Sequence, residues 1–123
     1  MHIKQAQVIN ETDFDVQVLH STQAVLVGFL AGWSKPCLLL EPILDEVAQS
    51  SNGQAKIFKA NVDDNPDLGT IYAIQAVPTL VYFFNGQVRA KIVGMASAKA
   101  ILARLHSLAA GNIPANDSQP PRG

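Results

Sequence analysis

The only cysteine of the chain, Cys37, closes the segment Gly-Trp-Ser-Lys-Pro-Cys at residues 32–37. Its thiol could act as a nucleophile, because the N-terminus of a helix favours the thiolate anion, whereas burial disfavours it. A single sulfur excludes a disulfide within the chain. Two interpretations therefore stay open: Cys37 is an inert buried residue, or it is a monothiol that forms mixed disulfides with other molecules.

Ser34, three residues before Cys37, is suited to cap a helix, because its hydroxyl oxygen can accept a hydrogen bond from an N–H group of the first turn. A catalytic serine would need a neighbouring base, and neither histidine nor aspartate is near it in the sequence. The three histidines, His2, His20 and His106, have no metal-ligand spacing with one another or with Cys37. We therefore expect neither a metal site nor a cofactor.

The elements that position these residues follow from the hydrophobic pattern. A continuous apolar run at residues 25–30 predicts a central strand that is buried on both faces. A helix should follow from about Lys35 to the turn Ser-Asn-Gly at residues 51–53, with a kink at Pro42. The apolar face expected for this helix consists of Leu38, Leu39, Ile43, Leu44 and Val47.

The rest of the chain alternates between strand and helix patterns. Further strands are expected at residues 3–9, 56–63, 79–84 and 87–93, and further helices near residues 11–19, 65–74 and 98–110. The order β-α-β-α-β-α-β-β-α predicts an α/β protein, with a mixed central sheet and helices on both of its faces. Residues 1–111 would form one domain, and residues 112–123, rich in Pro, Asn and Ser, a flexible tail.

The composition limits the class of partner. The chain has 123 residues, of which 9 are basic and 10 acidic, and its net charge of −1 argues against binding nucleic acid or an anionic membrane. No apolar run approaches the ~20 residues of a membrane span. The N-terminus lacks the apolar core of a signal peptide, so we expect a cytoplasmic protein. With only 15% charged residues, the surface should expose apolar area to protein partners.

Several motifs occur in an order typical of one family. They are Val-Leu-Val-x-Phe-x-Ala-x-Trp at residues 25–33, Pro-Cys at 36–37, Pro-Ile-Leu-Asp-Glu at 42–46, Asn-Val-Asp at 61–63, Ile-x-x-Val-Pro-Thr at 74–79, Phe-x-Gly at 84–86, and Gly94. Through these motifs, residues 5–111 resemble the thioredoxin family. The resemblance implies the thioredoxin fold and an ancestry among thiol–disulfide oxidoreductases.

The resemblance also implies what this chain has lost. The family carries Trp-Cys-x-x-Cys, in which the first cysteine attacks a substrate disulfide and the second resolves the mixed disulfide. Here Ser34 stands in place of the first cysteine, and only Cys37 is kept. Gly28 stands where the family has a buried aspartate, so Lys59, which matches the lysine beside that aspartate, has lost its partner. The chain should therefore be unable to run a dithiol cycle.

A peptide groove would survive the loss of the sulfur. In the family, the peptide bond that corresponds to Val77–Pro78 is cis and presents a backbone strip to an extended peptide. The resemblance implies a mostly apolar patch around this strip, made by Trp33, Lys35, Pro36, Ala76, Val77, Pro78 and Met95.

Two functional hypotheses follow, and both make proteins or peptides the partner. In the first, Cys37 acts as a monothiol that forms mixed disulfides with proteins or glutathione. In the alternative, the chain is a redox-inactive, peptide-binding or chaperone-like module. The reactivity of Cys37 distinguishes the two.

Overall fold

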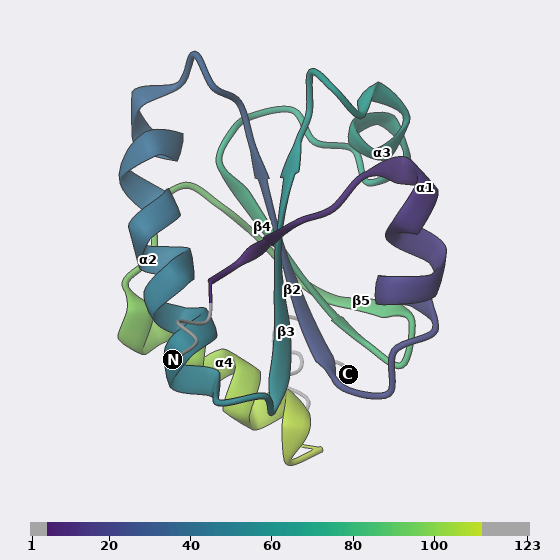
Figure 1. Cartoon of the computed structure of the whole chain (residues 1–123), viewed down its shortest axis with the longest axis vertical. Helices are drawn as coiled ribbons and strands as arrows, with labels where there is room; N and C mark the ends of the chain where they lie inside the picture. The colour runs from purple at the N-terminus through teal and green to yellow at the C-terminus, as the bar shows by residue number, and fades with distance from the viewer. Residues whose placement is uncertain (1–4, 112–123) are drawn as a thin grey trace, which may run out of the picture.

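The computed structural model describes residues 5–111, which form a five-stranded sheet with the strand order β1-β3-β2-β4-β5 (Figure 1). Strands β1 and β2 are parallel to β3, whereas β4 is antiparallel to both β2 and β5. The strands are β1 (Gln7–Val8), β2 (Ala24–Leu30), β3 (Ala55–Asn61), β4 (Thr79–Phe84) and β5 (Gln87–Val93). The helices are α1 (Glu11–Phe14), the π-helical η1 (Asp15–Leu19), α2 (Lys35–Ser51), α3 (Pro66–Ile71) and α4 (Ala98–Ala109). The predicted α/β fold and element order are confirmed.

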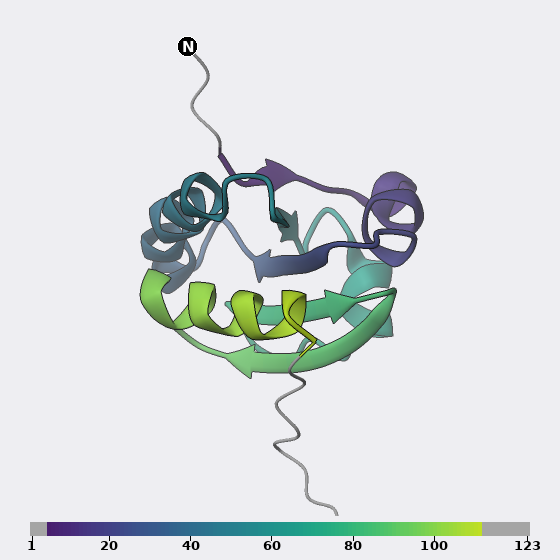
Figure 2. The ribbon, with the colours of Figure 1, turned by 90° about the horizontal axis from the view of Figure 1, so that it is seen from below.

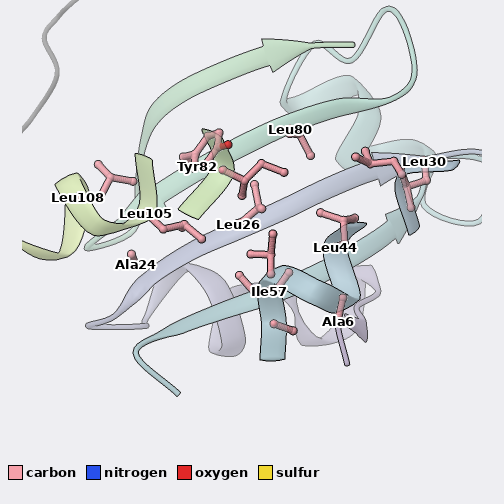
Figure 3. Close-up of a cluster of buried hydrophobic side chains, with 14 of the residues drawn as sticks. Ala6, Ala24, Leu26, Leu30, Leu44, Ile57, Leu80, Tyr82, Leu105 and Leu108 are labelled. Atoms are coloured by element: carbon pink, nitrogen blue, oxygen red, sulfur yellow. The ribbon is translucent and has the colours of Figure 1, made fainter. Parts of the chain in front are cut away.

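The sheet separates two hydrophobic clusters, one on each face. Helices α2 and α4 cover one face, and α1 and α3 cover the other (Figures 1 and 2). Every residue of β2 is buried, because its side chains alternate between the two clusters. On the α2/α4 face, the packed side chains include Leu26, Leu44, Leu80, Tyr82 and Leu105 (Figure 3). Strand β2 is thus a rigid central element, and its C-terminal end carries the segment with Cys37.

Helix α2 begins and ends as the sequence predicts. Ser34 is its N-cap, and Asn52, in the left-handed conformation with φ 52°, ends it. The helix runs without interruption through Pro42, which is exposed. No helix within residues 5–111 has the length and apolar character to cross a membrane.

The predicted apolar face of α2 is wrong in its first turn. Leu38 and Leu39 are 53% and 58% exposed, and the buried positions are Cys37, Leu40, Leu44, Val47 and Ala48. Successive residues of a helix point about 100° apart, so only one of the three consecutive leucines can face the sheet together with Cys37 and Leu44. The spacing selects Leu40 for the core and leaves the other two in solvent.

The first and third strands are shorter than expected. Within the described residues, β1 contains only Gln7 and Val8, because the backbone N–H of Ala6 donates to Asp45 Oδ1 of α2 (3.0 Å). Strand β3 ends at Asn61, whose side chain accepts the N–H groups of Asp63 and Asp64 and turns the chain. His2 and the predicted tail at residues 112–123 lie outside the described residues.

Candidate functional site

Four segments of the chain meet at the C-terminal end of β2. Across the sheet, Phe29 of β2 pairs with Thr79 of β4, and Thr79 pairs with Val93 of β5. The N–H of Gly94 donates to Pro78 O (2.9 Å), which joins the end of β5 to the loop before β4. The fourth segment follows β3, since Trp33 Nε1 donates to Asp63 Oδ2 (3.0 Å). The strand register therefore fixes the positions of the loops around residues 33, 63, 78 and 94.

Cys37 is enclosed at the start of α2. It has no exposed surface, and its Sγ accepts a hydrogen bond from the backbone N–H of Ala31 (3.4 Å). Such a thiol packs as a small hydrophobic side chain. Attack on an external disulfide would require an opening of this part of the structure, because a reagent has no direct path to the sulfur.

Ser34, three residues before Cys37, is the N-cap of α2. Its backbone is extended, with φ −96° and ψ 118°, and its Oγ accepts the N–H of Cys37 (3.3 Å). Ser34 is buried, with 6% of the residue exposed. The hydroxyl thus satisfies one of the free N–H groups of the first turn, as a capping serine does.

The residues predicted to form a patch come together on the surface around the Val77–Pro78 peptide bond, which is cis. Trp33 is 74% and Met95 46% exposed, and Pro78 is buried beneath the surface. Of the others, Lys35, Pro36 and Ala76 are exposed and Val77 is half-buried. The segments that carry these residues meet near the end of β2, and their role in binding stays a prediction.

Three further residues at or just beneath this surface were not anticipated as site residues from the sequence. Val93 is 62% exposed at the end of β5, next to Gly94. Asp63 holds the indole of Trp33, and the hydroxyl of Thr79 donates to Ala76 O (2.6 Å). Asp63 and Thr79 belong to the motifs at residues 61–63 and 74–79, so their positions in those motifs were the available signal.

The position of the missing acid is filled by the core. A Cβ placed on Gly28 would lie 2.9 Å from Leu44 Cδ1 and 3.6 Å from Leu80 Cδ2. The strand register puts Gly28 opposite Lys59 of β3. No space remains for a carboxylate at residue 28 unless Leu44 moves.

Lys59, which has lost the family's aspartate at residue 28 as a partner, pairs with two other carboxylates. Its ammonium group lies 3.5 Å from Glu41 Oε1 and 3.6 Å from Asp45 Oδ1, both on α2. The side chain of Lys59 is 18% exposed, so this is a half-buried ion-pair cluster. The two carboxylates lie one turn apart on α2, and no pattern in the sequence around Lys59 marks them as its partners. Within residues 5–111, no group of three or more potential metal ligands is brought together.

A mixed sheet in which a helix begins directly after a buried central strand, beside an X-Pro loop, defines the class of thioredoxin-fold proteins. The chain belongs to the thioredoxin family, since the family model Thioredoxin matches residues 5–107. A crystal structure of chloroplastic thioredoxin z, described as defining a type-specific target recognition, superposes with a TM-score of 0.79 at 29% identity. That likeness covers 90% of this chain and 100% of the other.

Curated relatives agree with this family. The chain is 38% identical over 92 residues to Thioredoxin M-type, chloroplastic, of Pisum sativum, covering 75% of this chain and 54% of that protein. It is 35% identical over 97 residues to Thioredoxin of Rickettsia felis, covering 79% and 92% respectively. With Thioredoxin 1 of Nostoc sp. it shares 43% identity over 89 residues, which covers 72% of this chain and 82% of that protein. The chain thus spans about half the length of the pea protein and most of the length of the bacterial ones.

Proposed function

We propose that this chain is a redox-inactive member of the thioredoxin family that binds extended peptide segments of other proteins. The observation that carries the proposal is the contrast between Cys37, which has no exposed surface, and Trp33 beside it, which is 74% exposed. The chemistry of the family needs an accessible thiolate, whereas binding needs only the surface around the Val77–Pro78 loop. In this chain the surface around Trp33 is exposed to solvent, whereas the sulfur of Cys37 is not.

The binding surface has the composition of a peptide groove. Trp33 from the segment after β2, and Val93 and Met95 from the end of β5, offer exposed apolar area, and the backbone of the loop before β4 is bonded to the second of these segments through Gly94 N–H and Pro78 O. Aromatic and methionine side chains are enriched where proteins bind partners, and an extended peptide can bond to an exposed backbone strip. The partner expected here is therefore an unfolded or extended segment with apolar side chains.

Disulfide reduction is not expected. Ser34 replaces the attacking cysteine, and its hydroxyl caps α2. Gly28 replaces the buried aspartate of the family, and Leu44 packs against it. We expect insulin-type disulfide reduction with a dithiol donor to proceed far more slowly than with an ordinary thioredoxin. A rate within about tenfold of such a protein, or ~1.4 kcal/mol in the barrier, would contradict this.

The accessibility of Cys37 tests the proposal directly. A chromogenic disulfide reagent should label Cys37 at least about tenfold more slowly in the native protein than in denaturant, because the thiol is enclosed. The unfolded chain is the matched control, since it carries the same single thiol. Native labelling as fast as that of a free thiol would make the monothiol redox role the better hypothesis.

Binding can be measured without any sulfur chemistry. Trp33 is the only tryptophan of the chain, so its emission reports on the proposed groove. An array of overlapping cysteine-free peptides identifies ligands, and titration with one of them should shift the emission of Trp33. Val93→Lys should weaken binding about tenfold or more by placing a charge in the apolar surface. Val88→Lys is the matched control, because Val88 is also exposed on β5 but lies at its opposite end.

The proposal fails if no cysteine-free peptide binds, or if Val88→Lys and Val93→Lys weaken binding equally.

The cytoplasmic location expected from the sequence stays a prediction, which fractionation of the source cells would check.

A further inference from the structure

A lysine on β5 connects this strand to the end of α3. Lys91 Nζ donates to Tyr72 O (2.9 Å) and to Ala73 O (3.0 Å), two carbonyl groups that follow the last residue of α3. The C-terminal end of a helix carries unpaired carbonyls and a partial negative charge, so a cation there is favourable. Lys91 thus acts as a C-terminal cap delivered from a different element.

The turn held by Lys91 is sterically unfavourable. Ala73 has φ 53°, in the left-handed region that a residue with a Cβ rarely adopts. Its N–H donates to Thr70 O (3.1 Å), and the N–H of Ile74 donates to Gly69 O (2.8 Å), so this residue sets the direction in which the chain leaves α3. Residues 76–78 of the proposed groove follow directly.

We propose that Lys91 is a positioning residue for the loop side of the peptide groove. The inference rests on the proposed function, because the groove has a role only if peptides bind there. Lys91 pairs with Val81 in the sheet, and two residues further along β5 comes Val93, an exposed apolar residue of the proposed binding surface. One strand therefore contributes to that surface and also anchors the loop that leads to Pro78.

The loop is held at both of its ends by the same part of the sheet. Near its start, Lys91 bonds the carbonyls of Tyr72 and Ala73, and at its end the N–H of Gly94 bonds Pro78 O. Without the Lys91 hydrogen bonds, the backbone after Ala73 should sample other conformations, while the hydrogen bond from Gly94 to Pro78 stays in place. A groove that is ordered before binding loses less entropy when a peptide binds, so affinity should fall with the loss of Lys91.

Lys91→Met tests the inference, since methionine keeps the aliphatic stem and removes the donor. Native-state hydrogen exchange of the Ala73 and Ile74 amides should become about tenfold faster, and that of the β2 amides should not change. Peptide affinity, followed by Trp33 emission, should fall about fivefold. Lys91→Arg should restore both quantities, because the guanidinium group can donate to the same carbonyls.

Two further variants separate positioning from general stability. Lys56→Met is the matched control, since Lys56 also donates to a backbone carbonyl, Gln17 O (3.4 Å), but of a different segment. Lys56→Met should change neither the hydrogen exchange of the Ala73 and Ile74 amides nor the affinity for peptide. Ala73→Gly relieves the left-handed strain, so in this background the loss of Lys91 should affect the loop less.

Unchanged exchange of the loop amides in Lys91→Met would overturn the inference, and so would an equal acceleration of exchange across all strands. If Lys91→Met accelerates exchange of the loop alone but no variant or wild-type protein binds any peptide, the proposed function is wrong while the action of Lys91 on the loop is supported.

Discussion

Leu44 occupies the space beside Gly28, where a Cβ would lie 2.9 Å from Leu44 Cδ1. The two residues come from α2 and β2, and both belong to the layer between the helix and the sheet. A side chain at residue 28 therefore requires the end of the Leu44 side chain to shift. Restoring the family's carboxylate would press it against Leu44, so the stability of variants at residue 28 measures what that shift costs.

Gly28→Asp should lower the free energy of unfolding by roughly 2–4 kcal/mol, because the substitution overpacks the core and buries a carboxyl group. Gly28→Ala is the matched control and should cost less, since only Leu44 Cδ1 must shift. Urea unfolding of both variants measures the difference. In the double variant with Leu44→Ala, the two changes should cost less than the sum of the single changes by about 1 kcal/mol. Wild-type stability of Gly28→Asp would show that Leu44 moves without cost.

The capping role of Ser34 can be compared with that of Ser97. Each is the N-cap of a helix, and each accepts the N–H three residues later, at 3.3 Å for Ser34 and 3.1 Å for Ser97. Ser34→Ala and Ser97→Ala should each lower stability by about 1 kcal/mol. Chemical denaturation measures both. If Ser34→Ala has no effect while Ser97→Ala does, the Ser34 hydroxyl is not needed for capping.

Ser34→Cys should allow a disulfide with Cys37, because the N-cap side chain already contacts the backbone of that residue. Oxidised dithiothreitol would accept the two electrons and two protons that the two thiols lose when the S–S bond forms. The product is detected as a loss of two hydrogens in the intact mass and a loss of thiol titre. Ser97→Cys is the control, since its thiol would lie at the start of α4 instead. Some disulfide reductase activity should appear, lower than in the family because Gly28 supplies no acid. Failure to oxidise under mild conditions would contradict the assigned geometry.

Local patterns predicted much of this fold. The strands β4 and β5 have the bounds that the sequence predicts, and the two residues between them, Asn85 and Gly86, form a tight turn with φ 53° and 78°. Ser34 was also predicted correctly as the N-cap of α2. These features depend on contacts within a few residues, which a single sequence displays directly.

Features that depend on distant contacts were missed. Three consecutive leucines at residues 38–40 follow Cys37 in α2, and the sequence alone does not say that Leu40 is the one that faces the sheet. Likewise, Asp45 pairs with Lys59 and accepts the N–H of Ala6, and both partners come from other elements. The surface near Trp33 was predicted through motifs, whereas Val93 and Lys91 belong to no motif and only the sheet register places them there.

Burial of Tyr82 predicts a loss of stability at high pH. Tyr82 is 2% exposed in the cluster between α2, α4 and the sheet, and burial raises its pKa to about 12, although the nearby Arg104 guanidinium lowers it in part. In the unfolded chain a tyrosine ionises near pH ~10. Between these two values the unfolded state loses a proton that the folded state retains, so the free energy of unfolding should fall as pH rises.

Tyr82→Phe should remove this part of the pH dependence. Phenylalanine keeps the ring and its contact with Arg104, whose Cζ lies 5.5 Å from the ring centroid. Urea unfolding near pH ~9 and pH ~12 should show a decline that is smaller in the variant by about 2 kcal/mol. Burial also raises the pKa of Tyr72, which is half-buried, so Tyr72→Phe should remove a smaller share. An identical decline in wild type and Tyr82→Phe would mean that the Tyr82 hydroxyl ionises as readily in the folded protein as in the unfolded chain.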